Sequence, residues 1–341
     1  MSQLLRSGVI NFASLRIPSA GARWTLAVGK SGDLLHKLQQ RFEPLSALNP
    51  HIFQGLKTSA DKIYLVQVRK TKGRLSECET ETGDLILIEK NILKPVVRGE
   101  HVQRYSIERS ANLHIIYPYQ VGENGRAIVL DAGHLAAKFP HTWSYLNANK
   151  SALGARDRGI WAKKSDWYAY ARSQNLSAFL GEKLLVPYMT TRLRTAPDQS
   201  EDLFFVNITT GGYGARFEDK RHSLLYLAGL LNSRLLDRAV RQLTNAFRGG
   251  YFAVGKQALE RLPFRTIDFT DRTDKARHDR MVESVERMLA LHKQLAPAKT
   301  AHEKTTIQRQ IDATDAEIDK LVYGLYGLSA DEIKIVEAAS E

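Results

Sequence analysis

The segment 271–341 repeats its apolar side chains at the spacing of a helix that packs along one face. A first series advances in steps of four and three residues, through Met281, Val285, Met288, His292 and Leu295. After Ala296-Pro297-Ala298 the steps resume, at Ile307, Ile311, Thr314, Ile318 and Leu321. Such steps keep one helix face against a neighbour, and proline cannot continue a helix. The sequence therefore predicts an antiparallel helical hairpin, which would cover the core of its own domain, dock a partner, or do both.

Residues 24–270 follow a different pattern, in which short segments change between strand-like and helical spacing. Runs typical of strands occupy 63–68, 85–88, 113–117, 127–130, 183–186 and 203–206. Apolar residues recur at helical spacing over 34–45, 140–154 and 223–243. Because strands and helices do not alternate regularly, we expect a mixed α/β (α+β) domain over residues 24–270, with residues 1–23 as a linker or N-terminal arm.

Charge is divided unevenly along the chain. The net charge is +12, yet the segment from Asp271 onward holds 11 basic and 14 acidic residues, which leaves +15 on the first 270 residues. A strongly basic surface usually binds a polyanion, although it can also serve only to keep a protein in solution. The sequence thus favours a nucleic-acid partner for the first 270 residues and a different role for the tail.

Several classes of protein lack their required residues here. The lone cysteine, Cys78, excludes an internal disulfide, and the scattered histidines form no metal-ligand pattern. No apolar run reaches the roughly 20 residues that a membrane helix needs. We therefore expect no metal site and no membrane contact, and a cytoplasmic location.

Catalytic motifs are also missing. A DNA adenine methyltransferase needs a glycine-rich loop for the methyl donor and an Asn/Asp-Pro-Pro-Tyr/Phe motif for the flipped base, whereas Asn49-Pro50 is followed by His51. We expect no catalytic or cofactor-binding residue. One alternative remains, because Glu218-Asp219-Lys220 downstream of Asp202 matches the string of a Mg²⁺-dependent DNA endonuclease that would use Glu218 and Lys220. Such a string arises readily by chance in a charged chain.

Several short segments match one known family, in order along the chain. The most specific is Leu93-Lys94-Pro95-Val96-Val97-Arg98-Gly99 followed by Arg104-Tyr105. The others are Gly55-Leu56-Lys57-Thr58 before Asp61-Lys62, Tyr145-Leu146 with Leu153 and Arg156, Trp167-Tyr168 with Arg172, Lys183, Leu231-Asn232-Ser233, Arg248-Gly249-Gly250-Tyr251 before Leu262-Pro263, and Ile318 to Leu328. From about Trp24 to its end, the chain resembles the TaqI-type C-terminal specificity (target recognition) domain of restriction-modification adenine-N6 DNA methyltransferases, including fused type IIG restriction enzymes.

The chain departs from that family pattern in three respects. Ser59 stands where the family usually has glycine, and Glu100-His101 stand where Arg-Asp is common. The methyltransferase half of the family's enzymes has no counterpart in this sequence.

The resemblance implies a non-catalytic domain or subunit that binds double-stranded DNA sequence-selectively and directs N6-adenine methylation, and cleavage where a nuclease is attached. A methyltransferase domain or subunit outside this sequence would be its partner. S-adenosylmethionine, and Mg²⁺ for a nuclease, would be bound there, and no cofactor by this chain. A further alternative is a protein-interaction subunit that acts through the helical tail.

We expect the DNA contacts at basic, hydroxyl and aromatic side chains of loops and segment ends: Lys57, Thr58, Arg98, Arg104, Lys163, Lys164, Arg172, Arg192, Arg194, Arg248 and Tyr251. The first four lie at strand or helix entrances, near glycine, where the backbone approaches a phosphate easily. Lys163, Lys164 and Arg172 are interleaved with Trp161, Trp167 and Tyr168.

Each group has a structural alternative. Arg98 would instead hold two loops together through backbone carbonyls, and at least one of the two tryptophans would belong to the core. Arg192 and Arg194 would lie on a solvated edge strand, and Arg248 to Tyr251 would form a tight turn before a strand.

Overall fold

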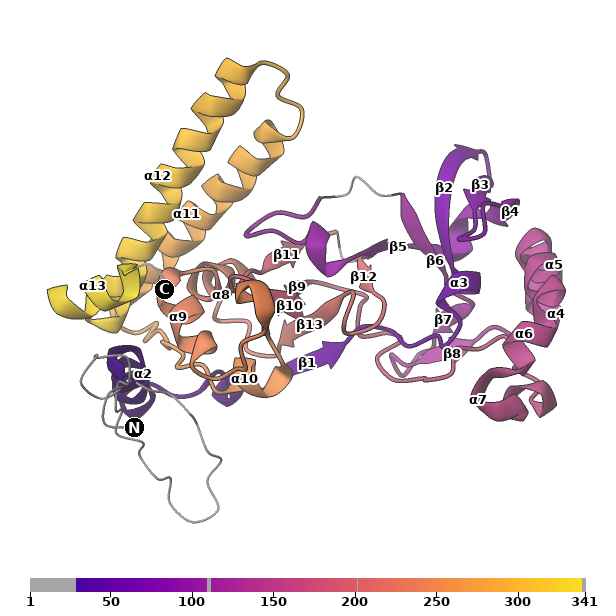
Figure 1. Cartoon of the computed structure of the whole chain (residues 1–341), viewed down its shortest axis with the longest axis horizontal. Helices are drawn as coiled ribbons and strands as arrows, with labels where there is room; N and C mark the ends of the chain where they lie inside the picture. Colours follow the sequence, from indigo (N-terminus) through magenta and orange to yellow (C-terminus); the bar gives the residue numbers. More distant parts are fainter. Residues whose placement is uncertain (1–28, 109–111, 201, 339–341) are drawn as a thin grey trace, which may run out of the picture. The chain divides into compact units, whose positions relative to one another are not determined.

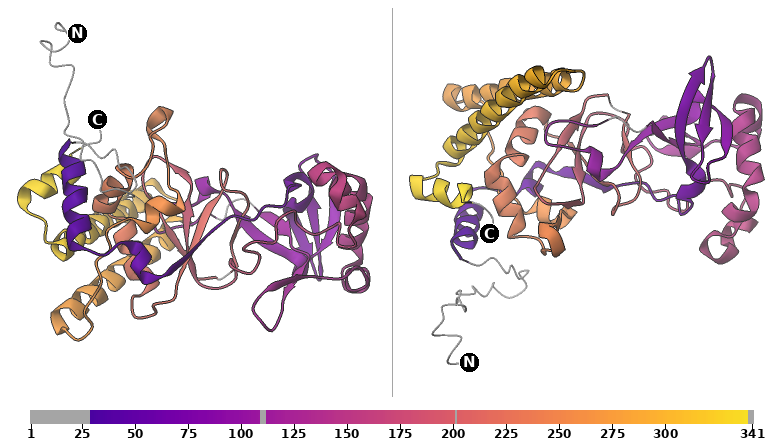
Figure 2. Two further views of the ribbon diagram at one scale, coloured as in Figure 1. Left: turned by 90° about the horizontal axis from the view of Figure 1, so that it is seen from below. Right: turned by 45° about the horizontal axis from the view of Figure 1, so that its top comes forward.

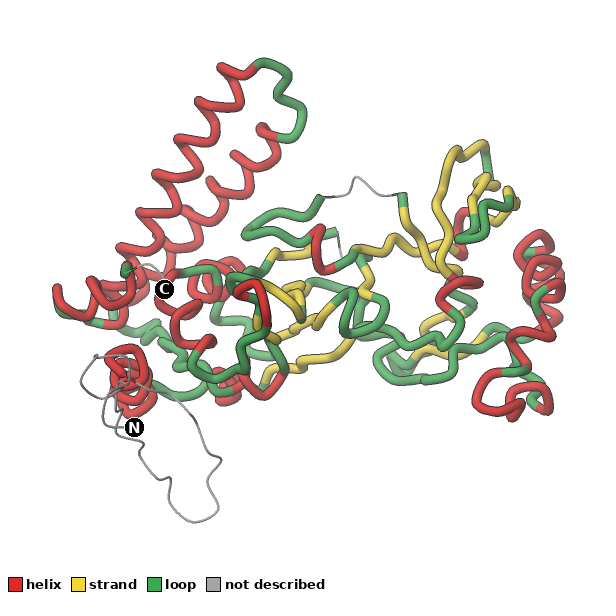
Figure 3. The backbone as a smooth tube through the Cα atoms, viewed as in Figure 1, coloured by secondary structure: helices red, strands yellow, loops and turns green. Residues whose placement is uncertain are grey.

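The structure is a computed structural model that describes residues 29–108, 112–200 and 202–338. The predicted arm of residues 1–23 lies outside this part. Two compact units are formed: the first unit contains residues 29–50, 190–193 and 217–338 of the described chain, and the second unit contains residues 51–189 and 194–216. Figure 1 labels the elements of both, and Figure 3 separates their helices, strands and loops by colour.

A six-stranded sheet forms the centre of the second unit, in the order β12-β5-β6-β2-β3-β4. Its strands are β2 (Leu65–Lys72), β3 (Leu75–Glu79), β4 (Leu85–Glu89), β5 (Leu93–Val97), β6 (Leu113–Ile116) and β12 (Phe204–Phe205). Strand β12 pairs with β5 in parallel, and the other pairs are antiparallel. Val66, Ile88 and Ile115 are fully buried on this sheet, so the alternation of the strands supplies the core.

The second unit has two smaller sheets. One has the order β1-β13-β9-β11, with β1 (Pro50–Gln54), β9 (Lys183–Pro187), β11 (Ala196–Asp198) and β13 (Gly212–Phe217). The other pairs β7 (Tyr119–Val121) with β8 (Ala127–Val129). Strand β10 (Met189–Thr190) lies where the chain passes from the second unit to the first.

Short helices complete the second unit, and both views of Figure 2 show the segment from α4 to α6 beside the six-stranded sheet. They are α3 (Asp61–Tyr64), η2 (Lys90–Ile92), η3 (Gly99–His101), α4 (Ala132–Lys138), α5 (Pro140–Ala148), α6 (Lys150–Gly154), α7 (Arg156–Gly159) and η4 (Ile160–Lys163), where η marks a 3₁₀ turn. The buried carboxylate of Glu89 accepts the backbone N–H groups of His141 (2.9 Å) and Thr142 (3.0 Å). The edge strand β4 thereby caps the first turn of α5.

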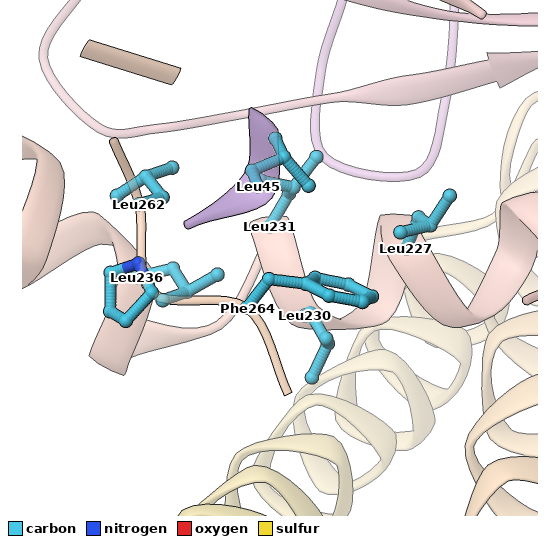
Figure 4. Close-up of a pocket in the computed structure, with 8 residues that line it drawn as sticks. Leu45, Leu227, Leu230, Leu231, Leu236, Leu262 and Phe264 are labelled. Carbon is cyan, nitrogen blue, oxygen red and sulfur yellow. The ribbon is translucent and has the colours of Figure 1, made fainter. Parts of the chain in front are cut away.

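The first unit is largely helical. Its elements are α2 (Gly29–Arg41), η1 (Leu45–Leu48), α8 (Leu224–Leu231), α9 (Arg234–Arg241), η5 (Arg248–Gly250), β14 (Phe252–Ala253), α10 (Lys256–Glu260), α11 (Arg272–Leu295), α12 (Ala301–Tyr326) and α13 (Ala330–Glu337). Apolar side chains from η1, α8, α9 and the segment after α10 pack together in Figure 4, namely Leu45, Leu227, Leu230, Leu231, Leu236, Leu262, Pro263 and Phe264. This apolar lining makes the space between them part of the core.

The predicted helical hairpin is confirmed. Helices α11 and α12 run side by side in opposite directions (Figure 1), joined by residues 296–300. Asp271 caps the first helix, and Thr300 with Glu303 forms a capping box on the second, which ends at Gly327 with a φ of 60°. The beginning of α11 packs on α8 so closely that a Cβ atom at Gly229 would lie 2.5 Å from the Met281 sulfur.

The mixed α+β class is confirmed, but several predicted elements are divided differently. The helix expected over 34–45 ends at Arg41, because Pro44 interrupts it before the separate turn η1. The helix expected over 223–243 is two helices, and Ser233 caps the second by accepting the N–H of Leu236. The strand expected from residue 63 begins at Leu65, after the turn α3.

The compact units do not follow the predicted division at residue 270, because the hairpin packs on α8 and belongs with it to the first unit. The limits 24–270 and 271–341 stay a prediction about functional parts. Among the described residues, no helix is long and apolar enough to cross a membrane.

Candidate nucleic-acid interface

Arg156 is a buried guanidinium that joins several loops of the second unit. Its side chain is 7% exposed, and it donates to four backbone carbonyls: from Nε to Leu153 (2.7 Å), from Nη1 to Thr58 (3.1 Å) and Ala169 (2.9 Å), and from Nη2 to Trp167 (2.5 Å). The planar fork of arginine can serve several acceptors at once. Arg156 therefore fixes three separate segments on one rigid support.

The loop after β1 is one of the segments that Arg156 holds. Thr58 is fully buried, and its hydroxyl accepts the N–H of Ala60 (2.9 Å) and donates to the Asp61 carboxylate. Lys57, directly before it, is exposed. Of these two predicted contacts, Lys57 is therefore the one whose side chain reaches the surface, while Thr58 shapes the loop.

The same loop borders a depression in the second unit of about 540 Å³. Residues 56–63, Ala152, Arg156 and Asn207 line it. Lys57 and Lys62 are exposed at this depression, and Lys62 Nζ lies 3.7 Å from Glu81 Oε1. Asp61 also lines it, and among the described residues no ion pair offsets the charge of Lys57.

The aromatic residues that are interleaved with Lys163, Lys164 and Arg172 are core residues. Trp161, Trp167 and Tyr168 are 5%, 6% and 2% exposed, so their rings are not free to stack on bases. The Lys164 ammonium lies 3.7 Å from the centroid of the Trp161 ring, and this contact holds an exposed cation in one place. The alternative that at least one tryptophan belongs to the core is therefore correct, and it holds for both Trp161 and Trp167.

Lys163 and Arg172 add two exposed cations to this region. Arg172 donates to the carbonyl of Ala171 (3.0 Å), and its Nη1 lies 3.4 Å from Asp157 Oδ2. The indole N–H of Trp161 (2.8 Å) and the Arg172 charge lower the pKa of the Asp157 carboxyl. Arg172 is thus partly neutralised, whereas Lys163 forms no ion pair within the described part of the chain.

The loop that follows β5 contains Arg98 and Arg104. Its glycine, Gly99, donates to the carbonyl of Thr210 (2.8 Å), and a Cβ atom there would lie 2.6 Å from the carbonyl oxygen of Gly211. Glycine is therefore required by close packing of two loops. Arg98 is exposed at the start of this loop, and Arg104 is half-buried with its guanidinium 5.4 Å from the Tyr105 ring.

Arg194 carries the loop-holding role that was considered for Arg98. Its Nη1 donates to Gln103 Oε1 (3.0 Å) and its Nη2 to the carbonyl of Gly99 (3.4 Å). Arg192 is half-buried in a turn of the first unit, where the Thr190 hydroxyl donates to the carbonyl of Arg192 (2.5 Å). No strand spans the two arginines, since β10 ends at Thr190 and β11 begins at Ala196.

Arg248 and Tyr251 lie on a tight turn of the first unit that is separate from the helical hairpin. The N–H of Phe247 donates to the carbonyl of Tyr251 (2.7 Å), and Gly249 and Gly250 both have a φ of 74°. Arg248 is exposed, and Phe247 and Tyr251 are 51% and 46% exposed. The tight turn and the exposed cation and aromatic rings thus occur together, and Phe247 joins the residues that the sequence had indicated.

The residues of the nuclease alternative do not form a metal site. Glu218 accepts a hydrogen bond from the Asn49 side chain (2.9 Å), and Asp219 is held by Arg221 and His222. Across residues 29–108, 112–200 and 202–338, no group of three or more His, Cys, Asp or Glu side chains could hold a metal ion. The described residues therefore give this alternative no support.

Comparison with known proteins agrees with the motif order. A family model, the TaqI-like C-terminal specificity domain, matches residues 94–264, which is half of the chain. The type II restriction enzyme and methyltransferase RM.Eco57I of Escherichia coli is 26% identical over 323 residues, covering 90% of this chain and 32% of that protein. The chain thus spans about a third of the length of this curated relative.

Proposed function

The chain belongs to the TaqI-like C-terminal specificity domain family, and from this premise we propose that it binds double-stranded DNA sequence-selectively as the specificity domain or subunit of a restriction-modification system. A methyltransferase module outside this sequence would carry out N6-adenine methylation at the selected site. Where a nuclease is attached, the same selection would direct cleavage. We further propose a cytoplasmic location, since such DNA targets lie there.

The observation that carries this proposal is a set of exposed cations on loops whose shape is fixed. Lys57, Lys163, Lys164 and Arg172 are exposed, and each lies on a segment that Arg156 or Trp161 holds in place. Cations on loops with a fixed backbone lose less backbone freedom when they meet phosphates. The charge of +15 over the first 270 residues provides the wider attraction for a polyanion.

We propose that the chain performs no chemistry by itself and binds no cofactor. S-adenosylmethionine, and Mg²⁺ for a nuclease, would be bound by the methyltransferase and nuclease modules. Incubation of the isolated chain with S-adenosylmethionine and target DNA tests this point, and transfer of a labelled methyl group would contradict it.

Fluorescence anisotropy with a labelled duplex across a salt series tests DNA binding by the full chain. Affinity should fall steeply with salt, with a log-log slope that loses about 0.9 for each phosphate contact removed. The variant Lys57→Ala/Lys163→Ala should show a shallower slope than the control Lys138→Ala, which removes one exposed lysine from α4. Selection from a random duplex pool should enrich one sequence, and binding without enrichment would contradict sequence selectivity.

A second role, docking of the methyltransferase module, is proposed for the helical hairpin. From Ala301 to Gln310, every residue except the half-buried Ile307 is exposed. The beginning of α11 covers the core of the first unit, whereas this outer part of the hairpin leaves its surface open to a partner. Capture of a separately expressed methyltransferase module by the full chain measures such docking.

A further inference from the structure

The segment 157–159 has a backbone conformation that side chains normally avoid. Asp157 has φ and ψ of 49° and 46°, and Arg158 has 60° and 36°. Gly159 continues in the left-handed region, with a φ of 84°. Glycine adopts this region easily, but two consecutive residues with side chains store strain there. Such strain persists only where the surrounding contacts impose it, and it concentrates at functional sites.

The contacts that impose this conformation surround the loop. Directly before it, the buried Arg156 guanidinium is bound to carbonyls of three segments. Asp157 Oδ2 accepts the indole N–H of Trp161 (2.8 Å), and the N–H of Gly159 donates to the carbonyl of Ala155 (3.1 Å). The loop is therefore shaped before any ligand binds.

The side chains at the tip of the loop point into solvent. Arg158 is exposed, and no hydrogen bond or ion pair in the described part of the chain involves its side chain. Ile160 is 58% exposed, so its apolar side chain is open to solvent two residues from Arg158. The strain thus holds a cation and an apolar side chain outward, where only a partner can contact them.

We propose that residues 157–160 are a preformed contact for duplex DNA, in which Arg158 binds a phosphate and Ile160 packs against the groove. This inference rests on the proposed function and adds two residues to it. A polyanion is favoured over a protein surface because the exposed cations Lys163, Lys164 and Arg172 flank the tip. The neighbouring Asp157 carboxylate already accepts hydrogen bonds from Trp161 and Arg172.

The substitution Arg158→Gly separates a DNA contact from a structural role. Glycine relieves the left-handed strain, so the variant should melt at the wild-type temperature or higher. Its affinity for duplex DNA should nevertheless fall several-fold, and its salt slope should shrink by about 0.9, as expected for one lost phosphate contact. Arg158→Lys keeps the charge and should keep the slope.

Ile160→Ser provides the second variant, because it removes apolar contact without a charge. The full chain with this substitution should bind its DNA target more weakly, while the salt slope stays at the wild-type value. Lys138→Ala, at the end of α4, is the matched control for the loss of one exposed cation and should change neither quantity.

The outcomes distinguish failure of the proposed DNA binding from failure of the contact proposed for residues 157–160. If the wild-type chain shows no salt-dependent binding, the proposed function fails and this inference fails with it. If the wild-type chain binds and Arg158→Gly binds equally tightly with the same slope, only the inference is overturned, and the loop would then be assigned to a protein partner. Lower stability of Arg158→Gly would also overturn it, because the side chain would then serve the fold.

Discussion

At the scale of single residues, Arg156 decides where the exposed cations of the second unit lie. Lysine has three donors on one atom and cannot replace a fork that reaches four carbonyls. We expect Arg156→Lys to lower the free energy of unfolding by about 2 kcal/mol or more, since each buried carbonyl left without a donor costs roughly 1–3 kcal/mol. Urea unfolding measures this loss. Arg172→Lys is the matched control because Arg172 is exposed, and equal unfolding midpoints for the two variants would contradict the assignment.

Residues of one chemical type look alike in the sequence, which limits how far the site could be predicted. Lys57 is exposed, as expected, but Lys183 is fully buried against Asp198, with Nζ and Oδ2 2.5 Å apart. Burial lowers the pKa of the Lys183 ammonium despite its partner. Thr58 is likewise buried. The partner of Lys183 lies 15 residues along the chain, and Arg156, which binds the Thr58 carbonyl, lies 98 residues along it, although the Thr58 hydroxyl itself bonds to neighbouring residues. The motif therefore indicated the loop but not which of its side chains face solvent.

At the scale of elements, two histidines connect helix α11 to the segment before α8. His222 Nε2 accepts the N–H of Ile267 (3.0 Å), and its Nδ1 lies 3.0 Å from Asp219 Oδ2. His278 of α11 accepts the N–H of Ser223 at its own Nε2 (3.2 Å). Both rings are buried. The His222 ring must stay unprotonated at Nε2 to accept the backbone hydrogen of Ile267, so this hydrogen bond requires a neutral His222 imidazole.

This joint predicts that acid destabilises the first unit. Burial lowers the pKa of His222 below its ordinary 6.5, although Asp219 acts in the opposite direction and His278 and Arg221 add to the lowering. A lowered folded-state pKa gives a contribution that is complete above pH 6.5 and is lost as the pH falls toward the folded-state value. Thermal unfolding between pH 7.5 and 5 should show this loss. His222→Gln keeps an acceptor without titrating, so its melting temperature should fall less over the same range.

The elements that were predicted well are those whose signals are local. The hairpin follows from apolar spacing and a proline loop, and β4, β6 and β9 follow from strand-like runs. The single helix expected over 223–243 was wrong because apolar residues continue across Ser233, while its cap depends on a hydroxyl that also occurs inside helices. Strand β1 and the bridge of Leu56 to Val206 depend on partners far along the chain, which no local pattern indicates.

At the scale of the whole molecule, the division of charge predicts that DNA binding and docking can be separated by surface substitutions. The first 270 residues carry +15 and the remainder −3, and Lys304 and Arg309 lie on the exposed outer part of the hairpin. We expect Lys304→Glu/Arg309→Glu to keep the wild-type salt slope for DNA, because the proposed phosphate contacts lie on the loops of the second unit, but to weaken capture of the methyltransferase module through mismatched charges.

The reciprocal variant completes this comparison. Lys57→Glu/Lys163→Glu places the same number of charge reversals on the exposed loops of the second unit. It should weaken DNA binding and flatten the salt slope while it leaves capture of the methyltransferase module unchanged. If each variant instead lost both DNA binding and capture of the methyltransferase module, the two surfaces would act as one. The DNA interface would then have to include the tail despite its net negative charge. If the hairpin variant alone lost DNA binding, the hairpin rather than the loops around Arg156 would be the part of the chain that binds the duplex.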